Sequence, residues 1–302
     1  MSDIPRTELF ELELELPSAP IQAVANRLIG FGARYQRIRQ DLRLLSDPDA
    51  IVAWSKKHHH GVVLPVCEVL ADRYPLLIFE GDVGTGKTAA AEAACDRLTR
   101  DLKQQALFFK LSTRVRGTGT VGQMSTLIND AFATVVAEAG KKRLAYLLID
   151  EGDSLGGARD IGHSHHEDKV AVNTIIQKID DVRKLGGRVV VILCTNRMHA
   201  LDPAIVRRAA CVERFERPNE AEREELFKLD FAGVEMSARQ VKELVRLTGP
   251  LDGKPGFTFS DLRTRLAPAA VAAAFPDRPL TVEDILNSAK TVRPSPAISQ
   301  AA

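Results

Sequence analysis

The chain has 302 residues and is 45% hydrophobic, enough for one sizeable α/β domain and a smaller one. Its 41 basic and 40 acidic residues leave a net charge of +1, which argues against a dedicated DNA- or RNA-binding protein and favours protein partners. No apolar run reaches the roughly 18 residues of a membrane span, and the acidic N-terminus differs from a signal peptide, so we expect a cytoplasmic protein with no membrane contact.

The first 70 residues are expected to form a short region of their own. Residues 10–16 alternate leucine or phenylalanine with glutamate, the period of a half-exposed strand. Residues 18–45 have a largely helical pattern, and residues 66–72 form a short helix just ahead of an apolar strand. We therefore expect the first domain boundary near residue 70.

Residues 71–218 have the pattern of a large α/β domain. Helical stretches at 123–139 and 170–185 alternate with short, continuously apolar strands at 76–79, 107–109, 146–149 and 189–193. Continuous apolar strands joined by helical crossovers predict a parallel sheet that lies between helices.

The C-terminal part of the chain is predicted to be helical. The strand pattern stops after Pro218, and helical stretches follow from 219, at 238–248, at 260–274 and at 281–291. We expect residues 219–291 to form a small helical lid domain. Residues 292–302 contain Pro294 and Pro296 and are expected to be a flexible tail.

The four cysteines are expected to be core residues. Cys67, Cys95, Cys194 and Cys211 are widely spaced, form no CxxC motif and lie in apolar surroundings. This pattern is typical of free thiols in a reducing compartment.

Residues 81–88, GDVGTGKT, match the phosphate-binding pattern GxxxxGKT. An apolar strand precedes the motif and an alanine-rich helix follows it, as such a loop requires. The glycines allow the backbone N–H groups to surround phosphate oxygens, and Lys87 adds a point charge. Thr88 would bind Mg²⁺. The sequence thus predicts a site for ATP and Mg²⁺ formed by Gly81, Asp82, Val83, Gly84, Thr85, Gly86, Lys87 and Thr88.

Two carboxylates follow the apolar strand at 146–149. Asp150 and Glu151 would lie at the carboxyl edge of the sheet, where open α/β sheets bind ligands. We expect Asp150 to hold Mg²⁺ and Glu151 to polarise the water that attacks the γ-phosphate.

Two further segments could complete the site. Asn196 follows the strand at 189–193 and could hold the attacking water, although an asparagine chosen for a turn is the alternative. Arg207 and Arg208 are adjacent, so they cannot both face the core. Either could stabilise charge on the phosphate in a neighbouring subunit, and surface charge is the alternative.

These motifs resemble those of the AAA+ ATPases. GDVGTGKT, LLIDEGDSL, VILCTNR and LDPAIVRRA, in this order, are similar to the Walker A, Walker B, sensor 1 and arginine-finger regions of that family. The resemblance implies an ATP-hydrolysing α/β domain with a helical lid, in a ring that is usually a hexamer with ATP at subunit junctions. It also suggests Arg263 as a sensor 2 residue, with Arg265 as a second candidate.

Within that family the chain resembles the pachytene-checkpoint type. The resemblance rests on residues 147–160, on residues 172–197 and on the arginine of LDPAIVRRA that is followed by alanine. It implies remodelling of a HORMA-domain protein, and bacterial relatives of this type occur with cGAS-like nucleotidyltransferases in antiphage signalling systems. We therefore expect a regulator that disassembles such a complex.

Two segments are expected to be substrate-facing pore loops. Residues 113–122, TRVRGTGTVG, lack the aromatic residue that related unfoldases use to grip a polypeptide. Arg114, Arg116 and Thr120 would line the channel instead, which would suit a short or acidic segment. His163, His165 and His166 lie in the second loop, and zinc binding is the alternative role for them.

Three other functions are compatible with parts of the sequence. A nucleic-acid loader would need a local basic face, and a protease-associated unfoldase would need a partner, because no HExxH motif is present. A nucleotide-gated scaffold would not need Glu151. ATP hydrolysis coupled to protein remodelling accounts for the motifs best.

Overall fold

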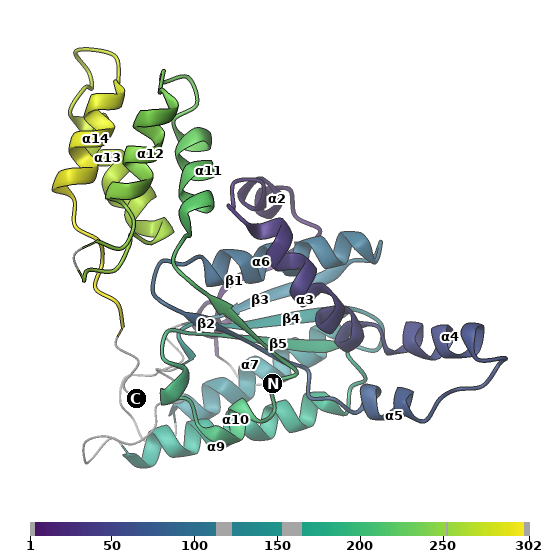
Figure 1. Cartoon of the computed structure of the whole chain (residues 1–302). Helices are drawn as coiled ribbons and strands as arrows, with labels where there is room; N and C mark the ends of the chain where they lie inside the picture. Colours follow the sequence, from purple (N-terminus) through teal and green to yellow (C-terminus); the bar gives the residue numbers. More distant parts are fainter. Residues whose placement is uncertain (1–3, 113–122, 153–164, 252, 299–302) are drawn as a thin grey trace. The chain divides into compact units, whose positions relative to one another are not determined.

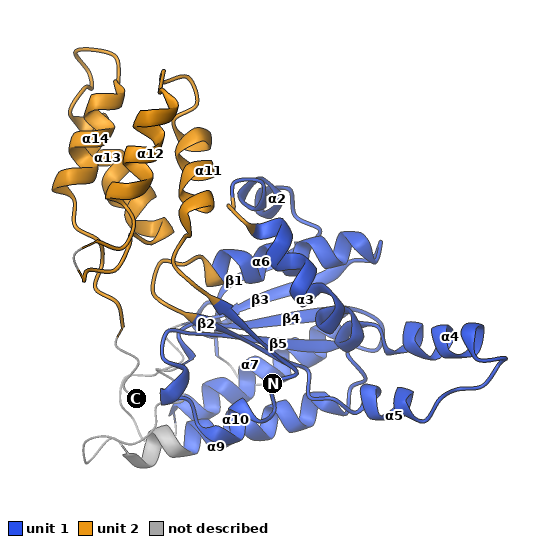
Figure 2. Cartoon of the chain, viewed as in Figure 1, with its two compact units in different colours: residues 1–27, 31–80, 88–214 blue, residues 28–30, 81–87, 215–302 orange. Residues whose placement is uncertain are grey.

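The computed structural model describes residues 4–112, 123–152, 165–251 and 253–298. The chain divides into two compact units (Figure 2). Unit 1 contains residues 1–27, 31–80 and 88–214, and unit 2 contains residues 28–30, 81–87 and 215–302. The phosphate-binding loop at 81–87 is therefore grouped with the C-terminal helices.

The centre of the large α/β part is a six-stranded sheet with the strand order β1-β3-β4-β5-β2-β6 (Figure 1). The pairs β3–β4, β4–β5 and β2–β5 are parallel, whereas β1 is antiparallel to β3. The strands are β1 (Phe10–Leu16), β2 (Leu76–Gly81), β3 (Ala106–Leu111), β4 (Leu144–Ile149), β5 (Val189–Thr195) and β6 (Cys211–Phe215). The predicted parallel sheet is thus confirmed for the four inner strands, while the prediction omitted β6.

Helices cover both faces of the sheet (Figure 1). One face packs on α7 and α9 through a core that includes Phe132, Val135, Ile175 and Ile179. The opposite face is covered by α3 and α6. The helices are α1 (Arg6–Leu9), α2 (Ala19–Ala25), α3 (Phe31–Ser46), α4 (Pro48–His58), α5 (Val66–Ala71), α6 (Lys87–Asp101), α7 (Gln123–Ala139), α9 (His165–Arg183), the 3₁₀ helix η2 (Met198–Ala200) and α10 (Pro203–Val206). None of the described helices has the length and hydropathy of a membrane-spanning segment.

Residues 1–70 do not form a separate region, so the predicted boundary near residue 70 is wrong. Strand β1 is the edge strand of the sheet, where Leu14 pairs with Phe108. Leu9 and Phe10 are buried in the same core as α7 and α9. The physical reason is that an isolated seven-residue strand leaves its backbone unpaired and its apolar face exposed, so it is stable only as part of a larger sheet.

Unit 2 contains a bundle of short helices that follows Pro218. They are α11 (Glu220–Asp230), α12 (Ala238–Leu247), the π-helix η3 (Asp261–Leu266), α13 (Ala267–Ala272) and α14 (Val282–Thr291). Capping boxes at Asn219, Ser237 and Thr281 satisfy the first backbone N–H groups and fix the starts of three of these helices. Their core contains Phe227, Leu244 and Ile285, and Ile29 from the N-terminal part packs into it.

The turn before β5 requires glycine at one position. Gly187 has a φ of 78°, and a Cβ added there would lie 2.1 Å from the carbonyl oxygen of Leu45. Its neighbour Gly186 has a φ of 59°, but nothing lies within 4 Å of an added Cβ. The two glycines share the backbone constraint, and only Gly187 also has a steric one.

We expect Gly187→Ala to lower the free energy of unfolding by about 3 kcal/mol, because it adds a backbone clash to the left-handed conformation. Gly186→Ala should cost only about 1 kcal/mol, the conformational part alone. Thermal and urea denaturation of the two variants measures the difference. Equal losses would mean that the Leu45 carbonyl moves away at no cost.

Candidate functional site

Two glycines of the phosphate-binding loop have no room for a side chain. Gly81 has a φ of 144°, and an added Cβ would lie 2.0 Å from the carbonyl oxygen of Phe215. Gly84 has a φ of 76°, and its added Cβ would lie 2.6 Å from Cβ of Ser260. The backbone N–H of Ser260 donates a hydrogen bond to the carbonyl oxygen of Gly84 at 3.1 Å. Ser260, the residue just before η3, therefore fixes the position of the loop.

Lys87 places a positive charge inside the loop. Its Nζ donates hydrogen bonds to the carbonyl oxygens of Gly81 at 3.0 Å and Asp82 at 2.8 Å. Thr85 Oγ1 also donates to the carbonyl oxygen of Asp82, at 2.7 Å. The side chain of Lys87 is buried, so the loop and its charge form one preorganised unit. This geometry fits the phosphate oxygens of a nucleotide.

Thr88 and Asp150 lie together in unit 1. Thr88 Oγ1 donates a hydrogen bond to Asp150 Oδ2 at 2.8 Å. A hydroxyl and a carboxylate at this separation suit a cation that prefers oxygen ligands, such as Mg²⁺. The pair therefore fits the metal predicted from the sequence.

Further charges surround Asp150. Lys110 Nζ lies 3.7 Å from Asp150 Oδ2 and 3.3 Å from Glu11 Oε1. Burial raises the pKa of Glu92, Lys110 opposes that shift and the negative charge of Asp150 adds to it. Sequence reasoning missed both residues: the pairing of β3 with β4 brings Lys110 to Asp150, and Glu92 lies on α6, four residues after Thr88.

Glu151 and Asn196 lie at the same edge of the sheet as Asp150. Ile149 pairs with Leu193 across β4 and β5, so the residues after both strands emerge side by side. Glu151 is exposed and has a φ of 51°, which is uncommon for a residue with a side chain, and its N–H donates to Asp150 Oδ1 at 3.0 Å. Strained backbone of this kind clusters at functional sites.

Arg207 and Arg208 lie at the opposite edge of the sheet. Arg208 pairs with Asp180 through two hydrogen bonds of 2.7 and 3.0 Å, and its guanidinium lies 5.2 Å from the ring centre of Tyr74. Tyr74 precedes β2, whereas the phosphate-binding loop follows it. At about 3.3 Å per residue, β2 alone separates the two edges by on the order of 20 Å.

The two arginines have different environments. The side chain of Arg208 is 12% exposed and is engaged by Asp180 and Tyr74, whereas Arg207 is exposed. This arrangement is consistent with the expectation that Arg207 and Arg208 cannot both face the core. Of the two arginines, Arg207 is therefore the one whose side chain can extend from the surface.

The two sensor 2 candidates lie in unit 2 and are ion-paired there. Arg263 binds Asp230 of α11 through Nε at 2.6 Å and Nη2 at 2.9 Å. Arg265 Nη1 lies 3.1 Å from Asp261 Oδ1. A role for Arg263 at the nucleotide would require exchange of the Asp230 partner.

Sequence reasoning missed Arg217, which holds the second residue of the loop. Its Nε and Nη2 lie 2.8 and 2.7 Å from Asp82 Oδ2. Its Nη1 donates to the carbonyl oxygens of Gly256 at 2.6 Å and Ser295 at 2.9 Å. No local pattern marks Arg217, since its partners come from three distant segments.

The C-terminal segment also binds the loop, so the prediction of a flexible tail is wrong as far as residue 298. The N–H of Ile298 donates to Asp82 Oδ1 at 3.1 Å, and Ser295 Oγ donates to Asp261 Oδ1 at 2.6 Å. Burial alone would raise the pKa of Asp261, but hydrogen bonds from Ser295 and Thr258 lower it. Residues 299–302 lie outside the described part of the chain.

Four of the six predicted pore residues are not described by the structure. Those outside the described residues are Arg114, Arg116, Thr120 and His163. The other two, His165 and His166, are the first residues of α9. Among the residues that are described, no group of three or more His, Cys, Asp and Glu could hold a metal ion.

Comparison with known proteins places this geometry among ATPases. Residues 77–219 match the family described as ATPase family associated with various cellular activities (AAA). CD-NTase-associated protein 6 of Escherichia coli strain KTE188 is 50% identical over 294 residues, which cover 97% of this chain and 98% of that protein.

Two solved structures are similar over nearly the whole chain. A chain of the E. coli MS115-1 HORMA:CdnC:Trip13 complex matches with a TM-score of 0.90 and 36% identity, over 99% of this chain and 100% of its own length. Rhizobiales Trip13 matches with a TM-score of 0.73 and 35% identity, over 95% of this chain and 99% of its own length.

We expect Arg217→Met to weaken ATP binding about tenfold, because it removes a charge-assisted pair and leaves the Asp82 carboxylate unbalanced beside the phosphates. Adding Asp82→Asn to this variant should restore most of the affinity, since the unbalanced charge is then gone. Titration with a fluorescent ATP analogue measures both. Arg293→Met, at an exposed position of the C-terminal segment, is the matched control. Unchanged affinity in Arg217→Met would contradict a role for the pair.

Proposed function

We propose that this chain, which belongs to the AAA family of ATPases together with the CD-NTase-associated proteins 6, hydrolyses ATP to remodel a HORMA-domain protein complex. The observation that carries the ATPase part is the Thr88–Asp150 pair directly after the glycine-shaped loop, with Glu151 beside it. The remodelling part is supported by the similarity to a chain of a HORMA:CdnC:Trip13 complex.

In this proposal each residue of the site has one task. Backbone N–H groups of the loop and Lys87 bind the β- and γ-phosphates. Thr88 and Asp150 hold Mg²⁺, which neutralises charge on the phosphate oxygens. Glu151 accepts a proton from the attacking water, and Asn196 orients that water. Arg263 remains a proposed sensor 2 residue.

Arg207 completes the site in trans. The residues that bind Mg²⁺ and the water lie at the carboxyl edge of the sheet, and Arg207 lies at the other edge, on the order of 20 Å away. An arginine that acts on the phosphates must therefore come from another copy of the chain. We propose a ring of copies, of the hexameric kind that the family resemblance suggests, with Arg207 of one copy at the nucleotide of the next.

The proposed substrate is a HORMA-domain protein in complex with a cGAS-like nucleotidyltransferase, as part of an antiphage signalling system. Arg114, Arg116, Thr120, His163, His165 and His166 are the residues proposed to face that substrate. We propose a cytoplasmic location, which the four free cysteines support.

We expect Glu151→Gln to bind ATP normally but to hydrolyse it at least about 10²-fold more slowly, because the glutamine cannot accept the proton. With ATP, the variant should hold the HORMA complex without dissociating it, whereas the unaltered chain should dissociate it. Phosphate release and size-exclusion chromatography of the mixture measure the two effects. Hydrolysis at the normal rate would identify another base, and dissociation without hydrolysis would refute coupling.

We expect Arg207→Ala to slow hydrolysis about 10³-fold with unchanged ATP affinity and thermal stability, because the side chain is exposed. Arg208→Ala should instead lower the melting temperature, since it leaves Asp180 unpaired. A 1:1 mixture of Arg207→Ala and Glu151→Gln chains should regain activity at about a quarter of its sites, those with both intact residues. No recovery in the mixture would mean that Arg207 does not act in trans.

A further inference from the structure

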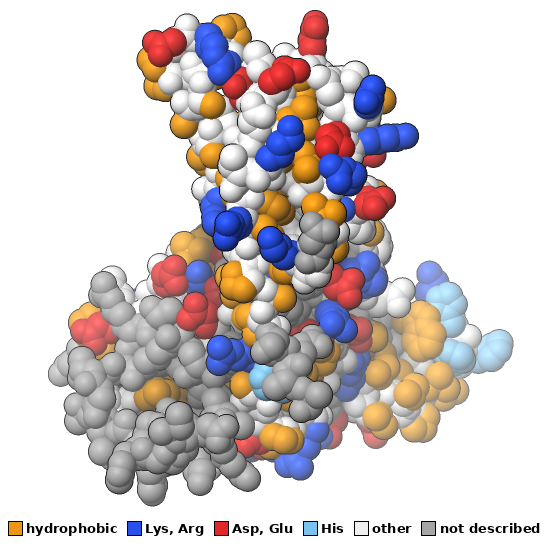
Figure 3. Space-filling view, turned by 60° about the vertical axis from the view of Figure 1, so that its left-hand side comes forward, with side chains coloured by type: hydrophobic (Ala, Val, Ile, Leu, Met, Phe, Trp, Pro, Cys, Tyr) orange, Lys and Arg blue, Asp and Glu red, His pale blue; other side chains and the backbone are white. Residues whose placement is uncertain are grey.

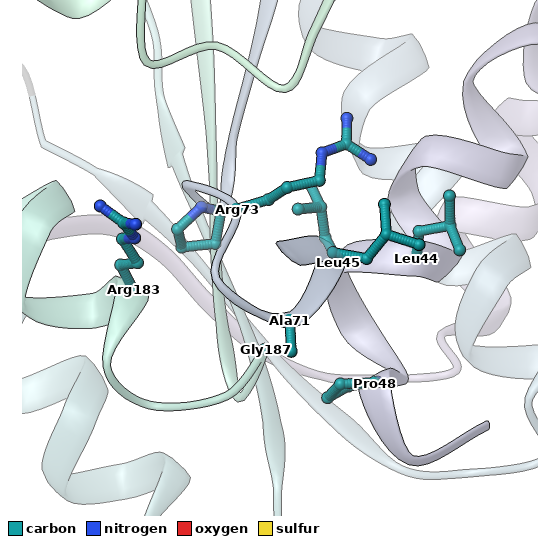
Figure 4. A pocket seen from close by; sticks show the side chains of 9 residues that line it. Leu44, Leu45, Pro48, Ala71, Arg73, Arg183 and Gly187 are labelled. Atoms are coloured by element: carbon teal, nitrogen blue, oxygen red, sulfur yellow. The ribbon is translucent and has the colours of Figure 1, made fainter. Parts of the chain in front are cut away.

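Basic and acidic side chains lie interspersed on the face of the chain that Figure 3 shows. The small hollow beside the start of β2 has a similar balance of charge (Figure 4). Two of its lining residues, Arg73 and Arg183, are paired with Asp41 and Asp72. The surroundings of Lys110 differ from both places, because several carboxylates share one ammonium group there.

Three carboxylates lie around Lys110 in unit 1. Its Nζ donates a hydrogen bond to Glu11 Oε1 at 3.3 Å and lies 3.7 Å from Asp150 Oδ2. Burial raises the pKa of the half-buried Glu92, the charge of Lys110 opposes that shift, and Asp150 and Glu11 add to it. The side chain of Lys110 is 16% exposed, so water screens these charges only in part. The excess of carboxylates favours a further cation at this place.

An irregularity of β1 brings Glu11 to Lys110. The register shifts between Phe10, which pairs with Leu111, and Leu12, which pairs with Lys110, so Glu11 is the extra residue of β1. Successive residues of a regular strand alternate between the two faces, and Glu11 would then point away from the face that Leu12 shares with Lys110. The shift instead lets its carboxylate reach Lys110. Bulges of this kind re-aim side chains and are frequent beside active sites.

Lys110 and Thr88 approach the same oxygen of Asp150. Thr88 Oγ1 donates to Oδ2 at 2.8 Å, and Lys110 Nζ lies 3.7 Å from that oxygen. The other oxygen, Oδ1, accepts the N–H of Glu151. A cation held by Thr88 and Asp150 would therefore lie close to the ammonium group of Lys110, and the two positive charges would repel each other. Movement of Lys110 toward Glu11, the nearer of its two measured carboxylate partners at 3.3 Å, relieves this repulsion.

We propose that Lys110 balances the charge of Asp150 in the absence of Mg²⁺ and turns to Glu11 once the metal is bound. Glu11 thereby raises the affinity of the site for Mg²⁺. The inference rests on the proposed Mg²⁺ site of Thr88 and Asp150 and adds a pair of positioning residues, neither of which touches the metal. Loss of the Glu11 carboxylate leaves Lys110 at Asp150, where it competes with Mg²⁺. Loss of Lys110 removes the competitor.

The first test measures how much Mg²⁺ strengthens nucleotide binding, a quantity that does not depend on hydrolysis. A fluorescent, non-hydrolysable ATP analogue is titrated in EDTA and in Mg²⁺, and the ratio of the two dissociation constants gives the coupling between metal and nucleotide. We expect Glu11→Gln to reduce this ratio about tenfold and Lys110→Met to increase it about threefold. Glu15→Gln, which removes an exposed carboxylate of the same strand, is the matched control and should leave the ratio unchanged.

The decisive test combines the two variants, because it shows whether Glu11 acts through Lys110. In the Lys110→Met chain, adding Glu11→Gln should change the ratio by less than about twofold, since no ammonium group remains to be released. An effect of Glu11 on the structure of β1 alone would persist in that chain. Circular dichroism, melting temperature and nucleotide binding in EDTA show that each variant is folded.

The outcomes separate this inference from the proposed function. An unchanged ratio in Glu11→Gln, or a reduction of the same size that persists in the Lys110→Met chain, would overturn the role of the pair. Asp150→Asn should remove the effect of Mg²⁺ on nucleotide binding, because it removes a metal ligand. If Asp150→Asn leaves that effect intact, or if Mg²⁺ does not strengthen binding to the unaltered chain, the proposed Mg²⁺ site itself is refuted and the inference falls with it.

Discussion

The positions of the site residues follow from the direction and length of the strands in the sheet. Parallel strands send all their carboxyl ends to one edge, so Asp150 and Asn196 meet there, and the loop after β2 begins at the same edge. The segment between β5 and β6 returns to the other edge, where Arg208 rests on Tyr74. Because the strands are rigid and buried, no local motion brings the two edges together. The site as proposed, with Arg207 acting on the phosphates, would therefore need two copies of the chain.

The phosphate-binding loop depends on contacts from distant parts of the chain. Its second residue, Asp82, is an acid beside a site for phosphates, which is electrostatically unfavourable in isolation. Arg217 compensates this charge, and the N–H of Ile298 adds a further hydrogen bond. The C-terminal segment thus belongs to the support of the loop, and Ser295 ties that segment to Asp261 at the start of η3.

Local patterns predicted much of the fold. The inner strands are continuous apolar runs, and the starts of α11, α12 and α14 have capping boxes that depend on residues three positions apart. The phosphate-binding motif and the Asp150–Glu151 pair are likewise local in sequence. Strand β6 was not predicted because it is only five residues long and Glu213 and Arg214 interrupt its apolar residues.

Features that depend on long-range pairing could not be predicted in the same way. The antiparallel pairing of β1 with β3, the position of Lys110 beside Asp150 and the contacts of Arg217 all join residues far apart in the chain. The position of Arg207 and Arg208 at one edge of the sheet also depends on long-range pairing. Their adjacency was visible in the sequence, but only the folded chain shows that Arg208 lies beside Tyr74, at the edge of the sheet opposite to Asp150.

The two adjacent arginines illustrate how one local sequence serves two purposes. The guanidinium of Arg208 binds Asp180 and contacts the ring of Tyr74, so it fixes the residues after α10 to α9 and to the segment before β2. Breaking two hydrogen bonds and a ring contact would cost free energy, so Arg208 is poorly suited to reach another molecule. The same contacts fix the backbone from which the exposed Arg207 extends. In the proposed mechanism Arg208 would therefore be a positioning residue for Arg207, and only Arg207 would touch the nucleotide.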